Sequence, residues 1–71
     1  MNPYENMANA IVVQAVTDYR KALHNLKRNS KYEPSQNVVS DVERFFRSEW
    51  YTVLTSISGE RLIKMLRQEV A

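Results

Sequence analysis

Residues 38–66 read VVSDVERFFRSEWYTVLTSISGERLIKML, and this stretch decides the fold. It holds both phenylalanines, the only tryptophan and the only glycine of the 71-residue chain. Apolar residues recur in it every three or four positions, which is the period of an amphipathic helix. The small polar residues of segment 55–59 interrupt that period. The stretch therefore predicts a helix, a tight turn and a second helix.

The helix before the turn has an apolar face centred on Phe46 and Trp50, which we expect to form the structural core. Glu49 falls within that face. Because burying an unpaired charge is costly, we interpret Glu49 as a structural carboxylate that pairs with a basic side chain or a helix end. Ser40, which begins a capping-box sequence, and Ser35 are alternative starts of this helix.

The opposite face of the same helix gathers three residues: Arg44, Arg47 and Tyr51. Two arginines beside an aromatic residue are typical of protein-binding surfaces. An ordinary solvent-exposed helix face can have the same composition. The pattern therefore gives a hypothesis for a protein-binding site and leaves the solvent-face interpretation open.

The helix after the turn begins near Ser58, a residue type that caps helices. Its outward face carries Arg61, Lys64 and Arg67. A helix, a short turn with glycine and a second helix with a basic outer face form the outline of a DNA-reading helix-turn-helix. Any helical hairpin has the same outline.

Segment 3–28 predicts a long first helix, because Asn2 and Pro3 form a start signal and apolar residues recur at helical spacing after them. Basic side chains concentrate at the end of this helix and in the loop that follows, and no acidic residue lies between Asp18 and Glu33. The basic set is Arg20, Lys21, His24, Lys27, Arg28 and Lys31. It favours a polyanion such as DNA or RNA as partner, although a solvated helix end has the same composition.

The composition restricts the chemistry of the chain. It has no cysteine and one histidine, which excludes disulfides and thiolate or multi-histidine metal sites and fits a reducing cytoplasm. It has no phosphate-binding glycine loop and no serine–histidine–aspartate set. We therefore expect no enzymatic activity, no catalytic residue, no metal and no cofactor. No apolar run approaches the roughly 20 residues of a membrane span, and no signal peptide is recognisable.

These patterns together predict an all-α fold. We expect one compact three-helix domain over residues 1–71, with a long first helix (3–28) and a helical hairpin (38–56 and 59–70). A chain of this size buries only a modest core. Its first helix offers more apolar surface than two short helices cover, so we also expect a homodimer.

Two segments, NPYENMANAIVVQAVTDYRKALHNLKRN (2–29) and VERFFRSEWYTVLTSISGERLIKML (42–66), resemble small uncharacterised proteins encoded by prophages and mobile elements of Gram-positive bacteria (Firmicutes). The resemblance covers nearly the whole chain. It implies a bacterial cytoplasm and a role in phage replication, regulation or defence evasion. It assigns no functional residue.

Two functional hypotheses follow. A nucleic-acid-binding module would use the basic residues of the first and last helices. A protein-binding module would use Arg44, Arg47 and Tyr51 to bind, and so modulate or inhibit, a host or phage protein. The presence of basic residues on two separate helices favours nucleic acid. The choice depends on whether those residues lie on one surface of the folded chain.

Overall fold

The computed structural model describes the backbone of residues 3–71 and the side chains of residues 6–71. Four helices form there: α1 (Pro3–Arg28), α2 (Glu33–Phe46), α3 (Glu49–Leu54) and α4 (Gly59–Val70). The predicted all-α fold is confirmed, as are the bounds of the first and last helices. The predicted helix cap at Asn2 lies outside the described residues.

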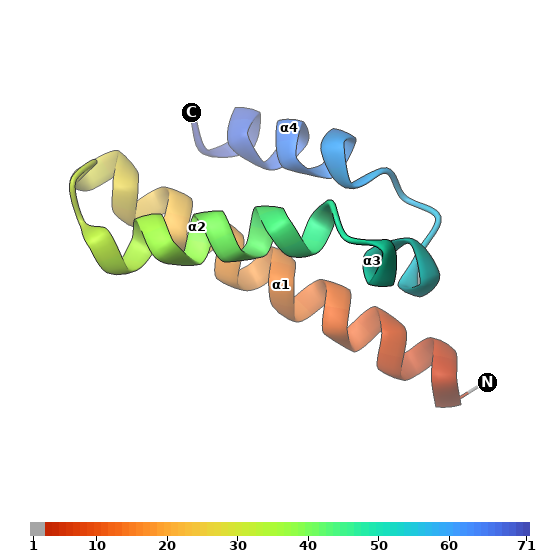
Figure 1. Ribbon diagram of the computed structural model, residues 1–71. Coiled ribbons are helices and arrows are strands. Elements are labelled where there is room, and N and C mark those ends of the chain that lie inside the picture. Colours follow the sequence, from red (N-terminus) through yellow and green to blue (C-terminus); the bar gives the residue numbers. More distant parts are fainter. Residues whose placement is uncertain (1–2) are drawn as a thin grey trace.

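The helices form a small bundle with one protruding end (Figure 1). α2 runs back along the C-terminal half of α1, and α4 packs against both of them. α3 lies against α1 at the end where the N-terminal half of α1 extends away from the bundle. The molecule measures 41 × 19 × 19 Å, and its long dimension is about the length of α1 at 1.5 Å per residue.

The prediction of one middle helix over 38–56 is wrong at both ends. α2 begins at Glu33, ahead of both predicted starts, because Pro34 occupies its first turn. A proline is tolerated there, since the first N–H groups of a helix have no intrahelical acceptor. α2 then ends at Phe46, and a separate short helix follows.

Ser48 separates α2 from α3. Its hydroxyl donates a hydrogen bond to the carbonyl oxygen of Phe45 at 2.6 Å and accepts one from the N–H of Tyr51 at 3.2 Å. Its backbone is extended, with φ −81° and ψ 157°. Serine side chains that bond nearby backbone groups compete with helix continuation and cap new helices. One residue therefore ends one helix and begins the next.

This break changes which residues are buried. Phe46 is 2% exposed, which confirms its predicted place in the core. Trp50, however, is 57% exposed and Glu49 is exposed, whereas Tyr51 is only 1% exposed. The predictions of a buried Trp50, a buried and paired Glu49 and a surface Tyr51 are wrong, because they assumed helical spacing across Ser48.

Three aromatic rings from three helices form the centre of the core. The ring of Phe46 in α2 meets Tyr19 of α1 and Tyr51 of α3 edge-to-face, at centroid distances of 5.7 and 5.6 Å. Such pairs contribute about 0.5–1.5 kcal/mol each beyond the area that they bury. α4 closes the core with three buried aliphatic residues: Ile63, Leu66 and Val70.

Gly59, at the start of α4, allows that helix to approach the end of α2. A Cβ atom at this position would lie 1.9 Å from the carbonyl oxygen of Phe46. No side chain fits there unless the backbone moves. The only glycine of the chain thus lies where the start of α4 closely approaches the end of α2.

Candidate binding site

The carboxylate that is buried and paired in this fold is Glu43, not Glu49. The Glu43 side chain is 14% exposed. It accepts a hydrogen bond from the hydroxyl of Tyr19 at 2.6 Å and one from the guanidinium of Arg67. Arg47 donates a longer bond to it at 3.4 Å and also pairs with Glu60. This polar cluster joins α1, α2 and α4.

The protonation states in the cluster follow from these contacts. Burial acts to raise the pKa of Glu43, but the hydrogen bonds from Tyr19 and Arg67 and the charges of Arg67 and Arg47 outweigh it and hold that pKa below its ordinary value. Burial, followed by the adjacent Glu43 carboxylate, raises the pKa of Tyr19. Tyr19 therefore stays a neutral donor, and Glu43 stays an anion at neutral pH.

Two of the predicted nucleic-acid-binding residues are neutralised by carboxylates. Arg20 donates to Glu69 of α4 at 3.1 Å, and Arg67 pairs with Glu43 of α2. α4 thus uses Glu69 to contact α1 and Arg67 to contact α2. Arg20 and Arg67 are therefore held in ion pairs between helices and add little free charge to a polyanion surface.

The other predicted basic residues remain at the surface. Those at the end of α1 and in the next loop are exposed: Lys21, His24, Lys27, Arg28 and Lys31. Arg61 and Lys64 are exposed on α4. Within residues 6–71 none of these seven takes part in an ion pair. The basic end of α1 therefore stays free of carboxylate partners within these residues, and so do Arg61 and Lys64 of α4.

The predicted surface patch of Arg44, Arg47 and Tyr51 does not form. Tyr51 packs in the core, and Arg47 is held by Glu43 and Glu60. Arg44 stays exposed and lies 3.8 Å from Asp41. An exposed pair at this distance contributes little.

A groove follows the seam between α1 and α2 instead, and we call it the seam groove. It consists of two hollows, of about 270 and 430 Å³, that share Asp18 and succeed one another along the same two helices. The first lies between Ile11 and Trp50, and the second ends at Asn25 and Tyr32. From Ile11 to Asn25 the groove extends about 21 Å at the helical rise per residue.

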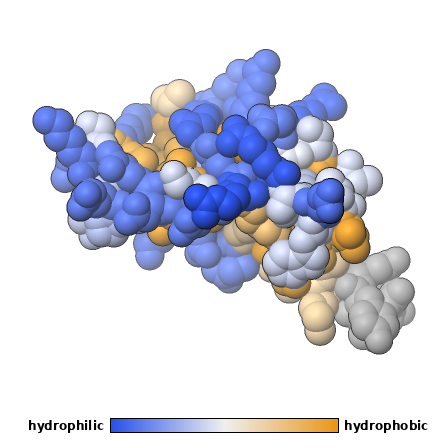
Figure 2. Space-filling model, in the orientation of Figure 1, coloured by the Kyte–Doolittle hydropathy of each residue, from blue (hydrophilic) through white to orange (hydrophobic). Residues whose placement is uncertain are grey.

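The Trp50 end of the seam groove is apolar. Its lining includes Ile11 and Ala15 of α1 and Val42 and Phe45 of α2. The indole of Trp50 packs edge-to-face on Phe45, at a centroid distance of 5.5 Å, and leaves more than half of its own surface to solvent. On the face that Figure 2 shows, most residues are hydrophilic, and several hydrophobic residues lie toward the protruding half of α1.

The middle and far end of the seam groove are more polar. Asp18 of α1 lines both hollows, Asp41 of α2 lines the hollow at the Trp50 end, and Lys21 of α1 lines the far hollow. Beyond them the groove passes Val38 and ends at Tyr32, which is 48% exposed. A solvent-exposed aromatic residue thus stands at each end, with two carboxylates between them.

The described residues were compared with the requirements of a metal site and of a membrane-spanning helix. Among them no three histidine, aspartate or glutamate side chains are placed to hold a metal ion. None of the helices in that range is both long enough and apolar enough to cross a bilayer.

No protein-family model, curated protein or solved structure matches this chain. The functions of the seam groove and of the basic end of α1 are therefore inferred from their geometry and charge.

Sequence reasoning missed Trp50 and Tyr32 as surface aromatics of one groove. A local signal for the first was present: Ser48 followed by Glu49 is a helix-start pair, a capping hydroxyl before a first-turn acid. If a new helix is assumed to begin at Ser48, Trp50 is no longer predicted to lie on the core-facing side of the preceding helix. No local signal places Tyr32 beside α1, because that position depends on how α2 packs.

Proposed function

We propose that this chain is a protein-interaction module, and that its seam groove binds one amphipathic helix of basic character from a partner protein. The observation that carries the proposal is the half-exposed Trp50 at the head of an apolar groove. Monomeric proteins rarely expose large apolar clusters without a use for them, and tryptophan is the residue most enriched among interface hot spots.

The shape of the groove suits a helix. A length of about 21 Å accommodates about 14 helical residues, or four turns. A bound amphipathic helix presents apolar residues at positions i, i+3 or i+4, and i+7. One such residue would pack on Trp50, the next between Ile11 and Val42, and a later one beside Val38 and Tyr32.

The charges of the groove select the partner. Two carboxylates, Asp18 and Asp41, line it against one basic residue, Lys21, in the far hollow, and Asp41 has only a weak, exposed contact with Arg44. Lysine or arginine side chains flanking the apolar stripe of the partner would reach both carboxylates. Like charges opposite these carboxylates would disfavour an acidic helix, which gives specificity. The partner is a host or phage protein if the resemblance to prophage-encoded chains holds.

The test selects binders from a display library of 14-residue amphipathic helices whose apolar positions are fixed and whose charged positions vary. Selected sequences should be enriched in lysine and arginine. Because Trp50 is the only tryptophan, its fluorescence should shift to the blue when a selected peptide covers it. Selection without basic enrichment, or binding that leaves Trp50 fluorescence unchanged, would overturn the proposal.

Variants locate the site. Trp50→Ala should weaken peptide binding at least about tenfold, as hot-spot truncations do, with fluorescence anisotropy of a labelled peptide as the readout. Asp18→Asn with Asp41→Asn should reduce the preference for basic over neutral peptides. Met65→Ala is the matched control, because Met65 is equally exposed but lies on α4 outside the groove.

Nucleic-acid binding is the second candidate function. The observation that favours it is the basic end of α1, where five exposed basic side chains have no carboxylate partner within the described residues. Phosphate contacts made by such residues give affinity that falls with salt, by a log–log slope of about −0.9 per phosphate on duplex DNA.

A gel shift in low salt tests this candidate. Charge reversal at Lys27 and Arg28 should lower both the affinity and the salt slope, and should leave the helix content unchanged. Charge reversal at Arg61 and Lys64 is the comparison on α4. Absence of any shift at ~100 μM protein in ~50 mM salt would exclude nucleic-acid binding, because non-specific binders reach 10⁻⁴–10⁻⁶ M at higher salt.

A further inference from the structure

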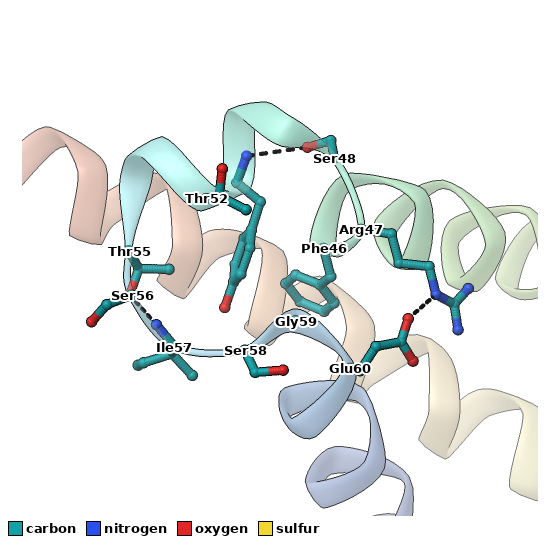
Figure 3. A pocket seen from close by; sticks show the side chains of 11 residues that line it. Phe46, Arg47, Ser48, Thr52, Thr55, Ser56, Ile57, Ser58, Gly59 and Glu60 are labelled. Carbon is teal, nitrogen blue, oxygen red and sulfur yellow. Dashed lines mark hydrogen bonds and ion pairs between the residues drawn. The ribbon is translucent and has the colours of Figure 1, made fainter.

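A second pocket lies on a different part of the molecule, where α2 ends, α3 passes and α4 begins (Figure 3). Its cavity measures about 400 Å³, and we call it the α3–α4 pocket. Its lining consists of residues 46–48, 51–52 and 55–60. Five of these residues carry aliphatic hydroxyl groups: Ser48, Thr52, Thr55, Ser56 and Ser58.

Tyr51 lines the same pocket, and its hydroxyl has no hydrogen-bond partner among the described residues. The residue is 99% buried, since only 1% of its surface is exposed. Burial raises the pKa of this hydroxyl, which keeps it protonated and makes it a donor. Leaving a buried donor unpaired costs roughly 1–3 kcal/mol, so an unpaired hydroxyl beside a cavity calls for an acceptor.

The hydroxyl groups of Ser48 and Thr52 donate to the carbonyl oxygens of Phe45 and Glu49 and are therefore used. Two other hydroxyl groups of the lining have no acceptor for their protons. The hydroxyl oxygen of Thr55 accepts from the N–H of Ile57 at 3.2 Å, and that of Ser58 accepts from the N–H of Arg61 at 3.4 Å. Neither hydroxyl donates to any group in the part of the chain that the structure describes. The oxygen of each hydroxyl group already accepts a hydrogen bond, and its proton is available to donate one to a ligand.

The N-terminus of α4 adds backbone donors and positive potential. The first N–H groups of a helix have no intrahelical acceptor, and the Ser58 hydroxyl accepts only the one from Arg61. Gly59 and Glu60 therefore present N–H groups at the positive end of a 12-residue helix dipole. The guanidinium of Arg47 stands at the same pocket.

We propose that the α3–α4 pocket binds a phosphate monoester. The hydrogen-bond donors of the pocket are three hydroxyl groups (Tyr51, Thr55 and Ser58), two backbone N–H groups (Gly59 and Glu60) and the guanidinium of Arg47. This set suits a phosphate dianion, because all of its oxygen atoms can accept hydrogen bonds. The cavity has the size of a small-molecule site and exceeds a bare phosphate, so a small organic group fits beside the phosphoryl oxygens. The Tyr51 hydroxyl lies below the solvent-accessible surface, so binding at this hydroxyl requires segment 55–58 to move outward.

Glu60 is the internal competitor for this ligand. Its carboxylate pairs with Arg47 at the pocket and repels a second anion. Glu60→Gln removes that repulsion and releases Arg47. One unit charge about 6 Å away in water is worth about a threefold change in affinity, so this variant should bind at least that much more tightly.

The experiment titrates the full chain with ribose 5-phosphate and, separately, with inorganic phosphate, ribose and chloride, and follows the amide resonances of Gly59 and Glu60 by NMR. Ribose 5-phosphate should shift both resonances with saturation, and ribose and chloride should not. Tyr51→Phe should weaken the binding by about tenfold or more, because it removes one hydrogen bond to a charged acceptor. Tyr32→Phe is the matched control outside the α3–α4 pocket and should leave the affinity for ribose 5-phosphate unchanged.

The two variants should change the affinity for ribose 5-phosphate in opposite directions: Tyr51→Phe should bind it more weakly and Glu60→Gln more tightly. Tyr51→Phe should remain folded, because its ring packing is kept and an unpaired buried hydroxyl is removed. Saturation by inorganic phosphate alone would overturn the monoester assignment. Equal shifts with chloride, or wild-type affinity in Tyr51→Phe, would overturn the site.

Discussion

Replacing Glu43 with alanine should destabilise the fold through Tyr19 more than through the lost ion pairs. The Tyr19 side chain is fully buried, and its hydroxyl donates to Glu43 at 2.6 Å. Without the carboxylate, that hydroxyl becomes an unpaired buried donor, at a cost of about 1–3 kcal/mol. Arg67 is half exposed and turns to water, so its lost pair adds only about 0–1 kcal/mol.

The sum, about 1–4 kcal/mol, corresponds to a fall in melting temperature of at least about 5 °C for a domain of this size. Circular dichroism melts measure it. Glu49→Ala is the matched control, since its exposed carboxylate should contribute under about 1 kcal/mol through the helix dipole.

A double-mutant cycle decides whether the reasoning holds. In the Glu43→Ala background, Tyr19→Phe removes the unpaired hydroxyl and keeps the ring contact with Phe46, so the double variant should be more stable than Glu43→Ala. In the wild-type background the same change removes a satisfied hydrogen bond and should destabilise. A second loss of stability in the double variant would refute the assignment of the cost to Tyr19.

Four further predictions follow from the fold. The pKa of Glu43 is held below its ordinary value in the folded state, so the ionised carboxylate stabilises the fold. This contribution should be complete above about pH 4.3 and should disappear as the pH falls through the folded-state pKa. Thermal melts of wild type and Glu43→Gln over that pH range should therefore converge in acid. Gly59→Ala should lower the melting temperature, since its Cβ would meet the Phe46 carbonyl oxygen at 1.9 Å, and unchanged stability would mean that α4 moves aside freely. Phe46→Ala should cost about 3–5 kcal/mol as a fully buried aromatic, and a melt close to that of wild type would contradict the proposed core. Sedimentation should report a homodimer, because Met7 and Val13 leave apolar surface exposed on the protruding half of α1, and monomer alone at high micromolar concentration would end that prediction.

The sequence allowed the long regular helices to be predicted, because their signals are local. The apolar period of segment 3–28 and the Ser58 cap before segment 59–70 both depend on neighbouring residues alone, and both helices have the predicted bounds. The middle of the chain was mispredicted because its apolar period continues across Ser48 almost without interruption. There the two hydrogen bonds of the Ser48 side chain end the helix, although the apolar pattern favours its continuation.

The candidate sites were predictable only in part, because pairing between helices is not local. The basic end of α1 could be read from the sequence, since no acidic residue lies near it along the chain. The neutralisation of Arg20 by Glu69 and of Arg67 by Glu43 could not, because these residues meet only after α4 packs on α1 and α2. The packing of α2 against α1, which is equally non-local, places Tyr32 and Trp50 on one groove.

One local event, the helix break at Ser48, creates the exposed groove residue and the buried pocket residue together. Had α2 continued unbroken, the helical period would have placed Trp50 in the core and Tyr51 on the solvent side. The break exchanges them: the indole joins the seam groove, and the Tyr51 hydroxyl becomes buried at the α3–α4 pocket. A half-exposed indole and an unpaired buried hydroxyl each lower stability, and both follow from the same two hydrogen bonds of Ser48. That combination is expected where a fold gives up stability for binding.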